Sequence, residues 1–135
     1  MIVVYHHEGC SKSREAVRLI RQAGHAPVLV DYAREGWTRA HLLGLFAAAG
    51  VTPRDALREA DMREAGRDPG TMTEAAVLDA MVADPVLVQR PFVCAPGGVR
   101  LCRPPGRVLD IIEAEGPVFD ADGTPVTGPM GARLA

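Results

Sequence analysis

The segment GCSKSR places one cysteine between a short apolar run and a stretch with helical periodicity. If Cys10 stands where a strand ends and a helix begins, its sulfur faces the free N–H groups of the first helical turn, which favour negative charge. Lys12 and Arg14 add positive charge close by, and the hydroxyls of Ser11 and Ser13 can donate hydrogen bonds to an anion. The pattern therefore predicts a reactive thiolate and an oxyanion-binding site at the same place.

The spacing around Cys10 separates this pattern from two other thiol motifs. A cysteine phosphatase loop places its arginine further along the chain, whereas Arg14 follows Cys10 after only three residues. A dithiol oxidoreductase needs a second cysteine where this chain has Ser13. One thiol is therefore expected to act alone, and another thiol must complete any redox cycle.

The other cysteines and the remaining histidines suggest no second reactive site. The three cysteines are irregularly spaced and include no C-x-x-C motif, which argues against a disulfide scaffold. We expect free thiols in a reducing compartment, with Cys94 and Cys102 as core residues of strands. His7, His25 and His41 have no metal-ligand spacing, so no metal site is predicted.

Composition excludes several classes of protein. A chain of 135 residues that is 47% hydrophobic and 24% charged is typical of one globular domain. A net charge of -2 provides no excess of positive charge for binding nucleic acid. No apolar run is long enough to span a membrane, and no signal peptide is evident at the N-terminus. We expect a cytoplasmic protein with no nucleic-acid or membrane partner.

The elements that must position Cys10 follow from hydrophobic periodicity. Apolar runs over residues 2–5 and 28–30 predict two strands, and the apolar period that begins at Ser11 and closes at Gly24 predicts a helix between them. A strand, a helix and a strand in about thirty residues form a βαβ unit, which is normally parallel. This unit would place Cys10 at the end of the first strand.

The rest of the chain predicts further helices and a hairpin. Residues 33–84 are predicted to form a helical insertion, residues 92–102 a hairpin around a Pro-Gly-Gly turn, and residues 108–112 a last helix. The order indicates an α/β fold, a thioredoxin-like four-stranded mixed sheet with flanking helices and this helical insertion. A single thioredoxin-like domain is expected over residues 1–112, and an extended C-terminal tail over residues 113–135.

Three blocks of sequence occur in a defined order: CSKSREAVRLI at Cys10, ALRE at Arg58, and RPFV…GGVRLCRPPGRVLDII from Arg90. Together they resemble the ArsC family of glutaredoxin-coupled arsenate reductases, whose fold is thioredoxin-like with a helical insertion. The resemblance covers about residues 2–112, with a weaker echo in the tail segment VFDADGTPV. It implies an enzyme that reduces arsenate to arsenite.

The resemblance implies a role for each matching residue. Cys10 is similar to the family's nucleophile, which takes arsenate as a thiol ester, and His6 to a histidine that helps to keep that cysteine ionised. Pro91 is similar to the cis-proline that thioredoxin-like folds place opposite the reactive cysteine. The arginines implied to hold the arsenate oxygens are Arg58, Arg90 and Arg103.

The resemblance also implies a reaction cycle and its partners. The cysteine thiolate attacks arsenic(V), glutathione attacks the adduct, and glutaredoxin reduces the mixed species with release of arsenite. Arsenate, glutathione and glutaredoxin are therefore the expected partners. Glutathione is a co-substrate, no cofactor is expected to stay bound, and a monomer is expected.

One departure from the family pattern leaves alternatives open. Before the cysteine the family commonly has a proline-containing turn, whereas this chain has His7-Glu8-Gly9. The charge of Glu8 would weaken anion binding unless the side chain points away or pairs with Lys12. An arsenate-reductase-like protein for another oxyanion or thiol substrate is one alternative. The other is a Spx-type regulator that binds RNA polymerase, although such proteins usually carry a C-x-x-C switch, which Ser13 removes.

Overall fold

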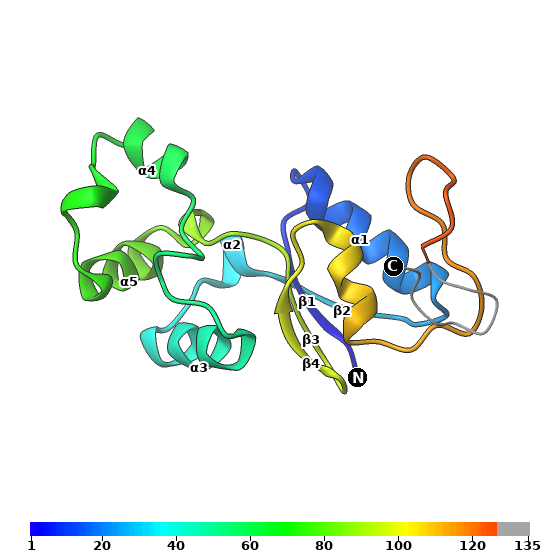
Figure 1. Ribbon diagram of the computed structural model, residues 1–135. Coiled ribbons are helices and arrows are strands. Elements are labelled where there is room, and N and C mark those ends of the chain that lie inside the picture. The colour runs from blue at the N-terminus through cyan, green and yellow to red at the C-terminus, as the bar shows by residue number, and fades with distance from the viewer. Residues whose placement is uncertain (127–135) are drawn as a thin grey trace. The chain divides into compact units, whose positions relative to one another are not determined.

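The computed structural model of the chain describes residues 1–126. These residues form two compact units (Figure 1). The first, here the sheet unit, comprises residues 1–30 together with the chain from Arg90 onward, and the second, the helical unit, comprises residues 31–89. The expected single domain with an insertion over residues 33–84 stays a prediction. Residues 127–135 of the expected tail lie outside the described part of the chain.

The sheet has four strands in the order β2-β1-β3-β4. Strand β1 pairs antiparallel with β3, with Val4 opposite Val93, and β3 pairs antiparallel with β4. The predicted four-stranded mixed sheet with flanking helices is confirmed. The bounds of its strands and of the helix that joins the first two are β1 Val3–His6, α1 Ser11–Gln22, β2 Val28–Asp31, β3 Phe92–Ala95 and β4 Gly98–Leu101.

The β3–β4 hairpin closes with Ala95 opposite Gly98, so its loop is the predicted Pro-Gly turn. Gly97 lies against the backbone of Ile111, where an added Cβ would come within 2.5 Å of the carbonyl oxygen. The Gly97 N–H donates to that same oxygen at 3.2 Å. Glycine is therefore required for the close approach that fastens the hairpin to the chain beyond β4.

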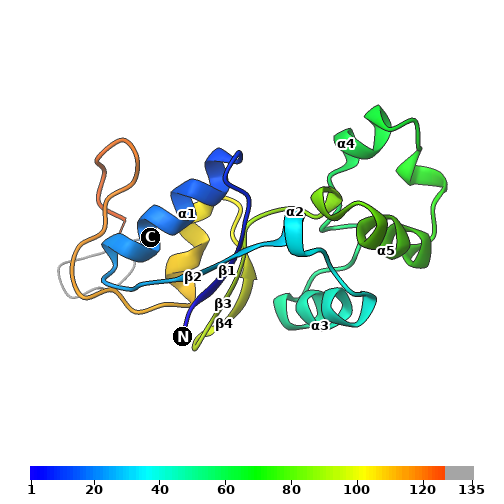
Figure 2. The same ribbon diagram turned by 180° about the vertical axis from the view of Figure 1, so that it is seen from behind.

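Helix α1 and the 3-10 helix η3, Pro105–Asp110, lie side by side against the sheet, as both views show (Figures 1 and 2). The core of the sheet unit lies between these layers. It includes Val4 and Val93 from the strands and Ile20 from α1, all fully buried. The apolar spacing of α1 thus buries the face that the sequence predicts.

The last helix begins earlier than predicted and has a different hydrogen-bond pattern. It was expected over residues 108–112, but the structure has a 3-10 helix from Pro105 to Asp110. The Arg107 N–H donates to the Pro104 carbonyl, and the Ile111 N–H donates to the Val108 carbonyl, both at 3.1 Å. The prolines at its start have no N–H to donate, which favours a short, tightly wound segment over a longer α-helix.

The helical unit contains α2, α3, α4 and α5. Thr38 caps α3 and Thr73 caps α5, each by accepting a backbone N–H at 3.1 Å. Tyr32, Trp37 and Phe46 are buried in this unit. The bounds of its helices are α2 Tyr32–Glu35, α3 Arg39–Ala49, α4 Glu59–Glu64, η1 Pro69–Thr71, α5 Glu74–Ala83 and η2 Pro85–Leu87.

The described part of the C-terminal segment is fastened to α1. The Phe119 N–H donates to Gln22 Oε1 at 2.6 Å, and the Phe119 carbonyl accepts from Arg18 Nη2 at 2.7 Å. After Phe119 the chain turns, and Asp120 Oδ1 accepts the N–H groups of Asp122 and Thr124, each at 2.9 Å. This turn is therefore held in a fixed place on the sheet unit.

Candidate active site

Cys10 is the N-cap residue of α1. Its backbone is extended, with φ -97° and ψ 120°, and its carbonyl accepts the Arg14 N–H at 3.1 Å. Strand β1 ends at His6 and the helix begins at Ser11, so the cysteine stands at the strand-to-helix junction that the sequence predicts. The residue is half-buried.

The surroundings of Cys10 favour the thiolate. Burial raises the pKa of the Cys10 thiol, but three donors more than offset this and leave the pKa below its usual value. They are the backbone N–H of Ser13, the Arg90 guanidinium and the backbone N–H of Lys12, and the charge of Arg90 acts in the same direction. The first helical turn thus supplies the amides that the sequence predicts, and one arginine comes from a distant part of the chain.

Strand pairing explains why Arg90 reaches Cys10. Because β1 and β3 run antiparallel, with Tyr5 opposite Phe92, the start of β3 lies beside the end of β1. The Arg90 side chain is buried there, with the residue only 8% exposed. The Arg90–Pro91 peptide bond is cis, the isomer that the family resemblance implies. Arg90 is thus held against the sulfur by the sheet itself.

Arg103 reaches the same edge through the second antiparallel pair. Phe92 lies opposite Leu101, so the chain that leaves β4 passes the start of β3. There Arg103 Nη1 donates to the Arg90 carbonyl oxygen at 2.8 Å, and the Arg103–Pro104 peptide bond is also cis. The sequence singled out both arginines, but not the hydrogen bond that joins them.

A hydrogen-bonded chain of three side chains, here the Glu8–His6–Ser13 network, underlies the Cys10 loop. His6 Nε2 lies 2.5 Å from Glu8 Oε2, and His6 Nδ1 lies 2.6 Å from Ser13 Oγ. Ser13 Oγ also accepts the His7 N–H at 3.1 Å. A carboxylate can only accept, so Nε2 must carry the proton of the bond to Glu8. The bond to His6 lowers the pKa of the Glu8 carboxyl.

Two expectations change because of this network. Ser13 was expected to present its hydroxyl to the substrate, but the residue is fully buried and the hydroxyl is engaged by His6 and His7. Its contribution to Cys10 is its backbone N–H. The sequence predicts that the charge of Glu8 weakens anion binding unless the side chain points away or pairs with Lys12, and in the structure Glu8 pairs with His6. The sequence contained the signal for this pairing, a carboxylate two residues from a histidine, but periodicity does not reveal it.

The remaining predicted residues lie in different surroundings. Ser11 is exposed beside Cys10, and Arg14 is exposed with its Nη1 donating to the Glu8 carbonyl at 2.7 Å. Arg58 belongs to the helical unit, where its Nε donates to Asp61 Oδ2 at 2.6 Å. The role of Arg58 in holding an anion stays a prediction.

The other two cysteines are not activated. Burial raises the pKa of Cys94, and it raises the pKa of Cys102 to about 12. Cys102 is fully buried, and its Sγ donates to the Arg100 carbonyl at 3.7 Å. Of the three sulfurs, only that of Cys10 has a lowered pKa.

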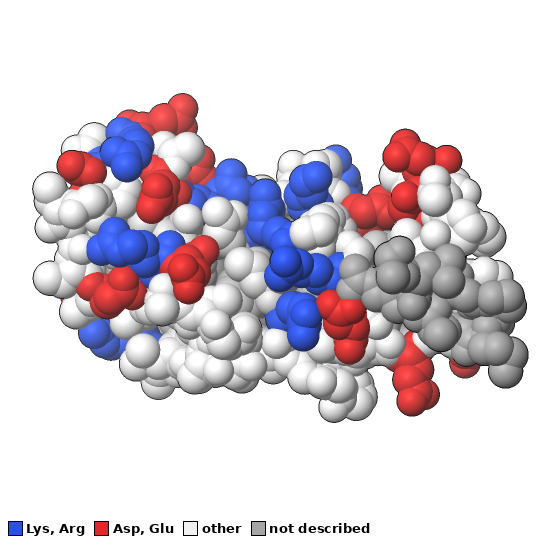
Figure 3. Space-filling view, viewed as in Figure 1, with Lys and Arg blue, Asp and Glu red and all other residues white. Residues whose placement is uncertain are grey.

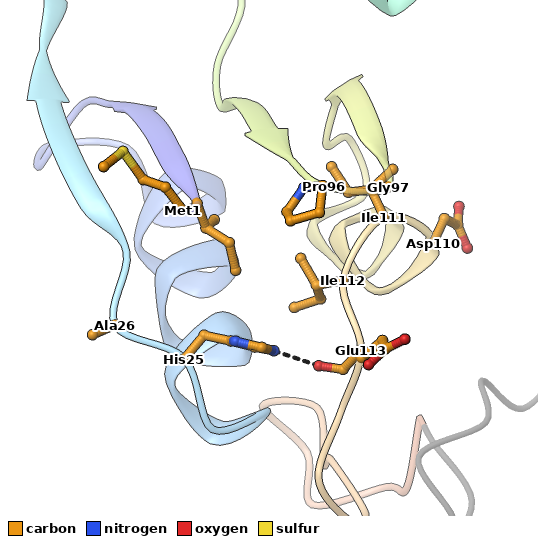
Figure 4. Close-up of a pocket in the computed structure, with 10 residues that line it drawn as sticks. Met1, His25, Ala26, Pro96, Gly97, Asp110, Ile111, Ile112 and Glu113 are labelled. Atoms are coloured by element: carbon orange, nitrogen blue, oxygen red, sulfur yellow. Dashed lines mark hydrogen bonds between the residues drawn. The ribbon is translucent and has the colours of Figure 1, made fainter.

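A pocket of about 610 Å³ lies at the other end of the sheet and holds none of the predicted site residues (Figure 4). It is bounded by Met1 at the start of the chain, by the hairpin loop and by the segment after η3. Across it His25 Nε2 lies 2.5 Å from the Glu113 carbonyl oxygen. Its size alone does not make it the reactive site, because the activated sulfur is elsewhere.

Within residues 1–126, no cluster of three or more histidine, cysteine or acidic side chains is arranged to hold a metal ion. His41 packs edge-on against the Trp37 ring. No helix in the described part of the chain combines the length and the apolar character needed to cross a membrane.

Comparison with known proteins agrees with this geometry. Residues 5–111 match the model of the ArsC family. The chain is 47% identical to "Arsenate reductase ArsI2" of Synechocystis sp. over 99% of both chains, and 40% identical to "Arsenate reductase" of Rhizobium meliloti over 98% of both chains. The structure of "Arsenate reductase from Vibrio cholerae" superposes with a TM-score of 0.72 at 31% identity, covering 82% of this chain and 97% of that one.

Proposed function

The chain belongs to the ArsC family, and from this premise we propose that it reduces arsenate to arsenite with Cys10 as the nucleophile. One observation carries the proposal. Among the three cysteines Cys10 alone has a lowered pKa, and a buried arginine and two helix N–H groups donate to its sulfur. A stabilised thiolate beside guanidinium groups suits attack on an oxyanion.

In the first step the Cys10 thiolate attacks arsenic(V). A sulfur–arsenic bond forms, an arsenic–oxygen bond breaks, and the oxygen leaves as water after protonation, so arsenic keeps its oxidation state. The guanidiniums of Arg90 and Arg103 would offset the negative charge on the remaining oxygens. Ser11 and Arg14, exposed at the start of α1, are further donors for the same anion.

The electrons for reduction come from outside the chain, because Cys10 has no activated partner thiol. Glutathione would add its sulfur to the arsenic adduct and displace a second oxygen. The glutaredoxin thiolate would then attack the glutathione sulfur, and the sulfur–arsenic electron pair would stay on arsenic, which becomes arsenic(III). Water releases arsenite and regenerates Cys10. A reducing cytoplasm would supply both thiols, and neither needs a bound cofactor.

The Glu8–His6–Ser13 network acts on Cys10 indirectly in this proposal. His6 contacts the Ser13 hydroxyl, and the Ser13 backbone N–H donates to the Cys10 sulfur. Glu8 fixes the ring from the other side. His6 therefore positions the residue that stabilises the thiolate, and is a positioning residue for the nucleophile.

The test is turnover of arsenate coupled to NADPH through glutathione, glutaredoxin and glutathione reductase. We expect an arsenate-dependent rate in the native chain and only background in Cys10→Ser. Omission of glutaredoxin should abolish the rate if the coupling is as proposed. A native chain that alkylates quickly at Cys10 but shows no arsenate-dependent rate would overturn the choice of arsenate and favour another oxyanion.

A further inference from the structure

A second pocket, of about 370 Å³, lies in the sheet unit and is lined in part by Ser11, the residue that follows Cys10. One wall is the first turns of α1, including Ser11 and Lys12, which follow Cys10 directly. The facing wall is the start of η3, which follows Arg103, and the turn at residues 120–122 closes one side. We call this the α1 pocket. Two of its lining residues, Ser11 and Pro104, are the chain neighbours of Cys10 and Arg103.

The walls of the α1 pocket are fixed. The hydrogen bonds of Phe119 to Arg18 and Gln22 hold the turn against α1. Apolar groups of Leu19, Pro105 and Val126 form part of the lining. Its volume lies at the small end of the roughly 300–1,000 Å³ that small-molecule pockets occupy. The site is therefore preformed and suited to a small ligand.

Two charged side chains of the α1 pocket are available to a ligand. Glu15 is paired with Arg18, and Asp120 accepts backbone N–H groups of its own turn. Among residues 1–126, neither the Lys12 ammonium nor the Asp122 carboxylate has a hydrogen bond or ion pair. Figure 3 shows the same division, with basic side chains over the start of α1 and acidic ones over the C-terminal turn. The pocket thus offers one cation on its α1 wall and one anion on the turn at residues 120–122.

We propose that the α1 pocket binds glutathione, with Asp122 receiving the γ-glutamyl ammonium and Lys12 receiving the glycine carboxylate. Glutathione carries an ammonium and an α-carboxylate on its γ-glutamyl end, a second carboxylate on its glycine end and the thiol between them, so the ammonium can pair with Asp122 and the glycine carboxylate with Lys12. A neutral thiol would form no ion pair with Lys12 or Asp122. This inference rests on the proposed function, in which glutathione attacks the Cys10 adduct.

The pocket can be tested without arsenate. The Cys10 thiolate attacks glutathione disulfide, a Cys10–glutathione disulfide bond forms, the original disulfide bond breaks, and glutathione thiolate leaves. No oxidant beyond the disulfide is needed. Bis(2-hydroxyethyl) disulfide undergoes the same exchange without charges, and the disulfide of N-acetylglutathione lacks only the ammonium.

The experiment measures the second-order rate of Cys10 modification by each disulfide in the native chain, in Asp122→Asn and in Glu113→Gln. Glu113 is an exposed acidic residue of the sheet unit outside the α1 pocket, so its variant is the matched control. We expect Asp122→Asn to slow glutathione disulfide about three- to fivefold, as for an exposed ion pair, and to leave the neutral disulfide unchanged. The native chain should react faster with glutathione disulfide than with its N-acetylated form. This rate ratio should fall to about one in Asp122→Asn and stay unchanged in Glu113→Gln.

Two results would overturn the proposal: an undiminished preference for the free ammonium in Asp122→Asn, or an equal loss in Glu113→Gln. Lys12→Gln gives a second check, since it should reduce the preference for glutathione disulfide over its glycine ethyl ester. Absence of arsenate turnover would contradict the proposed function. The rate ratios test glutathione binding in the α1 pocket separately, because they are measured without arsenate.

Discussion

Cys10 and Cys102 both belong to the sheet unit, and both have arginines close by in the sequence, in GCSKSR and in VRLCRPPGR. Their surroundings in the structure differ. Cys10 is half-buried at the start of α1, where N–H groups and Arg90 lower its pKa. Cys102 is fully buried, and burial raises its pKa to about 12, although the charges of Arg100 and Arg107 act in the opposite direction.

The difference shows that positive charge along the chain does not by itself activate a thiol. At Cys10 the donors contact the sulfur directly, and they include backbone N–H groups that a helix end leaves free. At Cys102 the sulfur instead donates to a carbonyl, which suits the protonated thiol. Desolvation decides the outcome where no donor reaches the sulfur.

The largest expected effect is selective alkylation. With a pKa of about 12, only about 10⁻⁵ of the Cys102 thiol is ionised at neutral pH, and its burial slows access further. We expect iodoacetamide at pH 7 to modify Cys10 roughly 1,000-fold faster than Cys102, as measured by mass spectrometry of the peptides. The rate at Cys10 should rise with pH through a midpoint below that of an ordinary thiol. Equal rates at the two sulfurs would remove the distinction between them.

Arg90→Ala should lower kcat/KM for arsenate by about 10²- to 10³-fold, the range for loss of one preorganised donor. It should also raise the pH midpoint of Cys10 alkylation, because the guanidinium that favours the thiolate is gone. Arg100→Ala is the matched control, since Arg100 pairs with Asp110 beside Cys102. Arg90→Lys should have values of kcat/KM and of the alkylation midpoint between those of the native chain and of Arg90→Ala, because lysine keeps the charge but lacks the planar guanidinium. A shift of the Cys10 midpoint in Arg100→Ala but not in Arg90→Ala would reverse the assignment.

The two thiols should also affect stability with opposite signs. An unfolded thiol titrates near pH 8.5. Above that pH the native chain retains the Cys102 proton that the unfolded chain loses, so this group lowers the free energy of unfolding by about 1.4 kcal/mol per pH unit. Cys102→Ala should therefore show a shallower alkaline decline in urea denaturation than the native chain.

The pKa of Cys10 is shifted downward, so its stabilising contribution is present above the unfolded pKa and is lost as the pH falls through the folded value. Cys10→Ala should accordingly lose stability relative to the native chain above about pH 8.5, and progressively less as the pH falls through the folded pKa of Cys10. The same denaturation series measures this. Parallel pH profiles for the Cys10→Ala and Cys102→Ala variants would contradict the comparison.

The smallest effect is expected for Glu8→Gln. Glu8 is 82% exposed in its side chain and reaches Cys10 only through His6 and Ser13. We expect less than about a fivefold change in kcat, in line with an exposed ion pair. Ser13→Ala should cost more, because it removes the hydroxyl that His6 and His7 both contact. A hundredfold decrease of kcat in Glu8→Gln would contradict this, because the effect would then be as large as that expected for Arg90→Ala.

The local features around Cys10 can be predicted from the sequence. The apolar run before Cys10 and the helical period after it predict the β1–α1 junction, which the structure has at this place. These features depend on backbone conformation and on neighbours a few residues apart. Short-range sterics and hydrogen bonding therefore determine them, and the residues involved lie within one short segment of the sequence.

The distant groups that meet the Cys10 sulfur cannot be predicted in this way, because they depend on strand pairing and packing. Antiparallel pairing brings Arg90 to Cys10 and Arg103 to Arg90, and packing buries the Ser13 hydroxyl that the sequence assigned to substrate. The pKa of Cys102 likewise depends mainly on its burial in the core, and less on the arginines that are close to it in the sequence. The solvation of an atom and the geometry of its hydrogen-bond donors depend on every segment that packs around it. Distance along the sequence gives neither quantity.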